Sequence, residues 1–123
     1  RARILAAATV CDDPLQVVSG CAAATQKLLV DQGLTSLDID LFEVHEAFAA
    51  TSIKCQRQLG IDDSRFNVNG GVLALGHPMG ATGSIMMGML IDELERQGLR
   101  TGIVATSGAA GTGTAMLIEL VEA

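Results

Sequence analysis

The chain has 123 residues, enough for one domain of ordinary size, and its core must be aliphatic because it contains no Trp or Tyr and only three Phe. The net charge of −6 provides no basic stripe to neutralise phosphates, which argues against a nucleic-acid partner. Neither a signal peptide nor an apolar run of membrane-spanning length is visible. The three cysteines show no CxxC spacing, which fits free thiols in the cytoplasm or another reducing compartment.

The first third of the chain predicts a strand followed by a helix. Residues 3–10 (RILAAATV) form a short apolar run typical of a buried strand. A helix is expected from Val17 to Gln32, with Ser19 as its N-cap and Gly33 as its stop. Cys21 lies near the start of this helix, where a helix dipole can lower a thiol pKa, although simple packing is the plainer interpretation.

A second strand and helix follow, and polar residues lie between them. Residues 39–44 (IDLFEV) alternate as a strand does, and residues 47–59 continue as a helix that ends at Gly60. His45 and Glu46 come at the carboxyl end of the strand, which is the usual place for a site in an α/β unit. A pair of surface residues at a strand end is the structural alternative.

The stretch of residues 67–83 (NVNGGVLALGHPMGATG) predicts a bent loop that displays one histidine. Its glycines favour turns and close backbone approach, and they make a long helix or strand unfavourable. Pro78 restricts its own φ and biases His77 towards an extended backbone, so the imidazole is presented by a stiff turn. A packed core histidine is the alternative interpretation.

The last third predicts a helix and two strands. The helix spans residues 84–97 and the strands span 100–106 and 114–121, joined by the glycine-rich turn 107–113. A connection this short indicates that the two strands pair antiparallel. The whole order predicts an α/β domain with a mixed sheet and helices on its faces.

The two histidines, His45 and His77, are the strongest candidates for chemistry. Either could donate a hydrogen bond to a developing oxyanion, directly or through water, or act as a general base near neutral pH. Backbone N–H groups of the turn Ser107 to Ala109 are a third candidate, but no GxSxG elbow surrounds the serine. Metal-ligand spacing, GxGxxG and P-loop motifs are lacking, so neither a metal nor a permanently bound cofactor is expected.

Three boxes in this chain resemble those of one known family. HEAFAA at residues 45–50 is similar to the NEAF or HEAF box of thiolases, and residues 67–83 are similar to their NxxGGAIALGHPxGASG signature. TSGAAGTGTAMLIE at residues 106–119 occupies the place of their CxGGGxG block. The order and spacing of these three boxes agree with those of thiolases. The chain therefore resembles the C-terminal half of the thiolase family over essentially its whole length.

This resemblance implies a fold, an activity and partners. The fold would be a thiolase-like half, βαβαβαββ, with a mixed five-stranded sheet, and residues 1–123 would be the C-terminal domain. Thiolases transfer acyl groups between coenzyme A thioesters, by thiolysis of a 3-oxoacyl-CoA or by Claisen condensation, so acyl-CoA would be the substrate. The nucleophilic Cys would lie in an N-terminal half absent from this chain, which alone would be inactive. The full protein would be a homodimer or tetramer.

The resemblance also assigns roles to particular residues. His77 would activate the missing Cys and bind the thioester oxygen, and His45 would replace the commoner Asn that holds a water in the same oxyanion hole. The remaining expected site residues complete the second hole or bind substrate, with the Ala109 N–H foremost: Ala109, Gly108, Gly76 and Asn69.

Ser107 departs from the family pattern, because thiolases carry a Cys there that shuttles the α-proton. A serine hydroxyl is a far weaker acid and base than a thiol, whose reference pKa is about 8.5. The resemblance therefore leaves three possibilities open. The proton shuttle could pass to another group, the enzyme could be a thiolase-fold condensing enzyme of altered chemistry like the Cys-His-His ketosynthases, or the protein could be a non-catalytic acyl-CoA-binding or assembly subunit.

Overall fold

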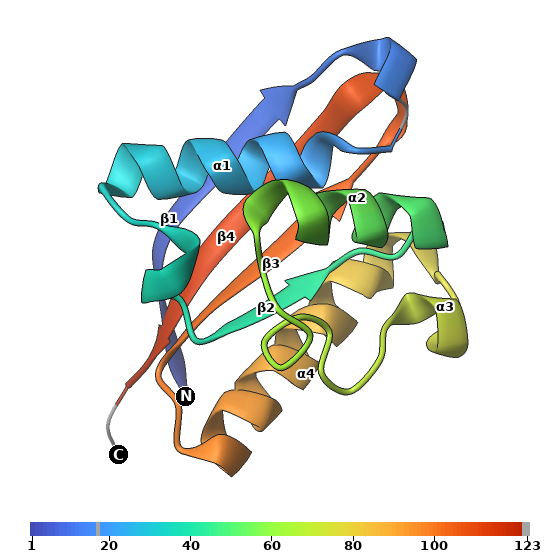
Figure 1. Ribbon diagram of the computed structural model, residues 1–123. Helices are drawn as coiled ribbons and strands as arrows, with labels where there is room; N and C mark the ends of the chain where they lie inside the picture. Colours follow the sequence, from blue (N-terminus) through green and yellow to red (C-terminus); the bar gives the residue numbers. More distant parts are fainter. Residues whose placement is uncertain (17, 122–123) are drawn as a thin grey trace.

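A computed structural model describes residues 1–16 and 18–121, which form a mixed sheet with helices on both faces (Figure 1). The strands lie in the order β1-β4-β3-β2. Strand β3 is parallel to β2 and antiparallel to β4, and β4 is antiparallel to β1. The predicted antiparallel pairing of the last two strands is confirmed. The strands are β1 (Ala2–Cys11), β2 (Leu41–Val44), β3 (Thr101–Ser107) and β4 (Thr112–Leu120).

Two helices cover one face of the sheet, and a third covers the other (Figure 1). Packing against α1 and α2 buries an aliphatic cluster that includes Leu28, Phe42 and Ile103. Packing against α4 buries a second cluster that includes Leu90 and Leu94. Within the described residues, no helix has the length and apolar character needed to cross a membrane. The helices are α1 (Gly20–Gln32), α2 (Ala49–Leu59), α3 (Val72–Leu75) and α4 (Thr82–Gln97).

The three long helices end where the sequence predicts. Gly33, Gly60 and Gly98 follow α1, α2 and α4 in left-handed conformation, which glycine adopts without steric cost. The start of α1 differs from expectation. Ser19 occupies the N-cap position, but its side chain makes no capping hydrogen bond, and the helix begins at Gly20. The expected start at Val17 lies outside the described residues.

The sheet has four strands in the described residues, so the expectation of five is wrong. The fifth strand is reduced to a single parallel bridge between Phe66 and Phe42. Asn67 ends it, because its φ of +45° turns the backbone away from the sheet. Its side-chain amide takes over the pairing: Oδ1 accepts the N–H of Val44 at 2.7 Å, and Nδ2 donates to the Val44 carbonyl at 3.0 Å.

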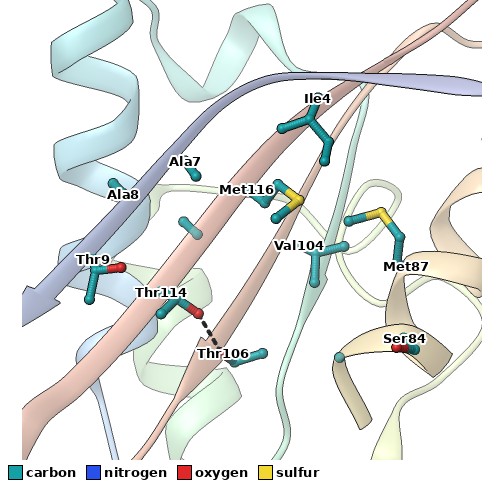
Figure 2. A pocket seen from close by; sticks show the side chains of 12 residues that line it. Ile4, Ala7, Ala8, Thr9, Ser84, Met87, Val104, Thr106, Thr114 and Met116 are labelled. Atoms are coloured by element: carbon teal, nitrogen blue, oxygen red, sulfur yellow. Dashed lines mark hydrogen bonds between the residues drawn. The ribbon is translucent and has the colours of Figure 1, made fainter. Parts of the chain in front are cut away.

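Strand β1 is more exposed than the predicted buried strand. It is an edge strand whose residues are mostly exposed, including Ile4 at 61% and Leu5 at 43%. Beside it lies a groove of about 640 Å³ between the sheet and the first turns of α4. Figure 2 shows Met87 of α4 opposite Val104 and Met116 of the sheet, so the lining is largely apolar. The apolar run therefore builds an uncovered face as well as a core.

Candidate functional site

His45 lies directly after β2, in a buried position where it is 4% exposed. Its N–H continues the parallel ladder by donating to the Ala105 carbonyl at 2.8 Å. Its ring Nδ1 is 3.3 Å from the carbonyl oxygen of Ser107. A carbonyl can only accept, so Nδ1 carries the proton and Nε2 of the neutral ring is an acceptor. Burial, reinforced by the neighbouring His77, lowers the pKa of His45 and favours that neutral form.

His77 is presented by an exposed loop between α3 and α4. The preceding Gly76 has φ +88° and ψ 164°, a region that is essentially restricted to glycine. The ring Nδ1 of His77 lies 2.7 Å from the hydroxyl of Thr82, the buried first residue of α4. This contact fixes the ring and leaves Nε2 of His77 for a reacting group.

The two imidazoles meet at one small cavity. Their ring centroids are 4.5 Å apart, with the planes inclined at 47°. The cavity measures about 240 Å³, and both rings line it together with Thr106 and Ser107 at the end of β3. Within the described part of the chain, Nε2 of His45 is buried without a hydrogen-bond partner. A buried polar atom normally has a partner, so an unpaired one at a cavity wall marks a place for a ligand or water.

Ser107 lines this cavity with the two histidines, and its hydroxyl also has a structural role. Ser107 Oγ accepts the N–H of Cys21 at 2.9 Å, which satisfies an otherwise free donor at the start of α1. Cys21 and Cys55 are fully buried behind it, and the hydrogen bond from Cys55 lowers the pKa of the Cys21 thiol to about 7. Neither thiol is accessible, which agrees with a packing role.

The other four predicted binding residues are not gathered at the cavity wall. The Gly108 N–H donates to the Thr112 carbonyl at 2.8 Å, and the Gly76 N–H donates to the Val72 carbonyl at 2.8 Å. Ala109 is exposed at the start of the short 3-10 turn Ala109–Gly111 and does not line the cavity. Asn69 is directed elsewhere, since its Nδ2 donates to Glu93 of α4 at 2.9 Å.

A buried carboxyl lies in β2 two residues before His45, whose backbone continues the strand pairing, and it therefore points to the same face of the sheet. Glu43 is 2% exposed. Burial, with smaller contributions from the charges of Glu46 and Glu93, raises the pKa of the Glu43 carboxyl to about 8. Glu43 is therefore largely protonated at neutral pH.

Sequence reasoning missed the contribution of Thr82, which holds His77, and left Glu46 without a role. Thr82 lies within the glycine-rich stretch of residues 67–83. Its hydrogen bond with His77 depends on the turn of residues 79–81, which places the start of α4 next to the imidazole. In the described ranges, no group of three or more His, Cys, Asp or Glu side chains is placed to hold a metal ion.

Comparison with known proteins agrees with the resemblance. The family model described as the thiolase C-terminal domain matches residues 1–120. A 3-ketoacyl-CoA thiolase of Aliivibrio salmonicida is 42% identical over 122 residues, covering 97% of this chain and 32% of that protein. An acetyl-CoA acetyltransferase of Shinella zoogloeoides is 42% identical over 117 residues, which cover 95% of this chain and 30% of that protein.

The fold is also similar to that of a solved structure. The crystal structure of the Bacillus anthracis acetyl-CoA acetyltransferase matches with a TM-score of 0.90 and 38% identity, over 98% of this chain and 30% of that one. The chain thus spans about a third of the length of the relatives that it matches. With a family match over nearly all of its residues, the chain belongs to the thiolase family.

Proposed function

We propose that this chain supplies the histidine and oxyanion half of a thiolase-type acyltransferase site acting on coenzyme A thioesters. The observation that carries the proposal is the meeting of His45 and His77, 4.5 Å apart, at a cavity where Nε2 of His45 has no partner among the described residues. The names of the relatives, thiolase and acetyl-CoA acetyltransferase, support the same class of reaction.

In this proposal His45 acts through water. Its Nδ1–H donates to Ser107, so Nε2 accepts one hydrogen of a water molecule in the cavity. The second hydrogen of that water is then directed at the thioester oxygen on which negative charge develops. Pre-oriented donors of this kind lower the barrier because they need no reorganisation when the charge forms.

His77 has two successive tasks. With Nδ1 held by Thr82, its Nε2 faces the place where a nucleophile and a thioester would meet. Unprotonated, it accepts the proton of a thiol nucleophile and so generates the thiolate. Protonated, it donates a hydrogen bond to the same thioester oxygen as the water on His45.

The nucleophile must come from outside this chain, and we propose that an N-terminal thiolase half supplies it. Cys21 and Cys55 are fully buried, and Cys11 does not line the cavity between the histidines. The apolar groove beside β1, with the exposed Ile4 at its rim, is a surface that such a half would cover. The two halves together are termed the full-length enzyme below.

Thiolysis of acetoacetyl-CoA by free coenzyme A tests this proposal. We expect turnover by the full-length enzyme and none by the 123-residue chain alone, because no cysteine thiol of the chain is accessible at the cavity. The measurement is loss of the 3-oxoacyl-CoA absorbance. Equal turnover by the isolated chain, or its absence from the full-length enzyme, would contradict the proposal.

A second candidate function is favoured by Ser107. Its hydroxyl occupies the place of the family's proton-shuttling thiol and accepts the Cys21 N–H. A condensing enzyme that obtains its carbanion by decarboxylation needs no such acid–base group. The alternative is therefore a thiolase-fold condensing enzyme that uses the same two histidines.

Replacing Ser107 by Cys separates the two candidates. If the reaction is thiolysis, Ser107→Cys in the full-length enzyme is expected to raise kcat at least about tenfold, because a thiol titrates far closer to neutral pH than a hydroxyl. Ser107→Ala, which removes the hydroxyl without adding a thiol, is the matched control and should give no increase. An unchanged rate in Ser107→Cys would favour decarboxylative condensation, to be checked with malonyl-CoA.

A further inference from the structure

Glu46, which follows His45, links the end of β2 to the segment that carries the other histidine. Its Oε2 accepts the N–H of Leu73 at 3.2 Å, and its Oε1 accepts Nδ2 of Asn67 at 3.2 Å. Leu73 belongs to the short helix α3, which ends immediately before Gly76 and His77. One carboxylate thus joins the residue next to one imidazole to the helix that leads to the other.

Gly71 gives this carboxylate its room. A Cβ added at Gly71 would lie 2.4 Å from Oε2 of Glu46 and 2.5 Å from its Cδ. The φ of Gly71 is −143°, which any residue can adopt, so glycine is required here by space and not by conformation. Any larger residue at position 71 would drive the carboxylate of Glu46 away from Leu73.

Asn67 holds the second oxygen of the Glu46 carboxylate, Oε1. Its Oδ1 accepts the Val44 N–H, which orients its Nδ2 towards the Val44 carbonyl and Glu46. The carboxylate therefore faces two donors, the amide of Asn67 and the backbone N–H of Leu73. Each of its two oxygens accepts one of these hydrogen bonds, so the side chain of Glu46 satisfies both donors.

The segment that follows has little else to hold it. Val72 is buried, but residues 73–81 are all exposed, and the next buried residue is Thr82. Apolar burial therefore contributes little to the position of His77 within this segment. The segment is anchored at its far end by the contact of His77 with Thr82 and at its near end by Glu46.

We propose that Glu46 is a positioning residue that fixes His77 against His45, acting through Asn67, Gly71 and the Leu73 N–H; these four residues are termed the Glu46 clasp. The glutamate does not reach the cavity, so it acts through the placement of the second imidazole. The catalytic consequence rests on the proposed function, whereas the structural consequence does not.

Hydrogen exchange in the full-length enzyme tests the clasp without any assay of activity. Glu46→Gln keeps the size of the side chain but turns one acceptor into a donor that faces another donor. Amides of residues 72–77 are expected to exchange about tenfold faster in Glu46→Gln than in the parent enzyme, with β3 and β4 unchanged. Asp63→Ala is the control and should exchange like the parent, because it removes an exposed carboxylate whose hydrogen bond among the described residues is to Gln56.

Gly71 provides a second, independent arm. Gly71→Ala should displace the carboxylate of Glu46 and speed the amide exchange of residues 72–77, as Glu46→Gln does. When Gly71→Ala is added to Glu46→Ala, the exchange rates of these amides should not rise further. Additive effects of the two substitutions, or exchange in Glu46→Gln equal to that of the parent, would overturn the clasp.

Kinetics then separates positioning from simple stabilisation. In an active enzyme, Glu46→Gln is expected to lower kcat about tenfold with KM for acetoacetyl-CoA changed less than twofold, because chemistry and not binding depends on the imidazole pair. An unchanged kcat despite faster exchange would overturn the positioning role. Absence of thiolysis in the parent enzyme would instead refute the proposed function, and the exchange result would decide the role of Glu46.

Discussion

Replacing His77 by Ala in the full-length enzyme is expected to lower kcat/KM for thiolysis by roughly 10³-fold or more. The residue is assigned both proton transfer and oxyanion stabilisation, each of which contributes about 10²-fold or more when a single group is removed. The side chain is exposed and held by one hydrogen bond to Thr82, so its loss should leave the fold intact. Steady-state kinetics and the thermal midpoint, measured together, check both statements.

Thr82→Val is the graded companion of this substitution. It removes the hydroxyl that holds Nδ1 of His77 but preserves the shape of the side chain. A net loss of about one hydrogen bond corresponds to a fall of about tenfold in kcat/KM for thiolysis. A His77→Ala enzyme that keeps more than a tenth of the parent rate would contradict the assigned role, and the cavity would then depend on His45.

The site could be predicted from the sequence where its signals are local. His45 follows an alternating strand, His77 lies between Gly76 and Pro78, and Ser107 ends a strand before a glycine-rich turn. A strand end or a stiff turn restricts where a side chain is presented, so each candidate could be found from its immediate neighbours. The structure then brings all three to one cavity.

Contacts between distant segments could not be predicted in the same way. Asn67 turns away from the sheet and bonds Val44 with its side chain, which reduces the expected fifth strand to one bridge. The start of α1 is capped by Ser107 from another element, although Ser19 stands at the position where capping was expected. Residue propensities identify which kinds of residue cap a helix or form a turn. The hydrogen-bond partner of such a residue depends on which backbone segment the fold brings near it.

The exposure of β1 has a different cause. An apolar run such as residues 3–10 is typical of a strand covered on both faces. Here α1 covers one face, while Ile4 and the apolar groove remain open on the other. In the described residues the apolar run is therefore covered on one face only, which its pattern does not reveal.

Replacing Gly113 by Ala is expected to destabilise the protein by about 3 kcal/mol or more, because the start of α1 rests directly on β4. A Cβ at Gly113 would lie 2.0 Å from the carbonyl oxygen of Gly20, the first residue of α1. In the reverse direction, a Cβ at Gly20 would lie 2.4 Å from the carbonyl oxygen of Thr112. Both obstacles are backbone atoms, so neither can be relieved by rotation of a side chain, and overpacking of this kind costs most where the structure cannot shift.

Gly88→Ala is the matched control for that substitution, since the same methyl group is added where, apart from its chain neighbours and the adjacent backbone of its own helix, no atom lies within 4 Å. Gly88 is inside α4, so the alanine should stabilise the protein by about 0.5–1 kcal/mol through helix propensity. Urea unfolding of the three proteins should therefore give midpoints in the order Gly88→Ala, parent, Gly113→Ala. A Gly113→Ala protein as stable as the parent would show that α1 can move away from β4. The Cys21 N–H would then lose Ser107, and the cavity wall would change with it.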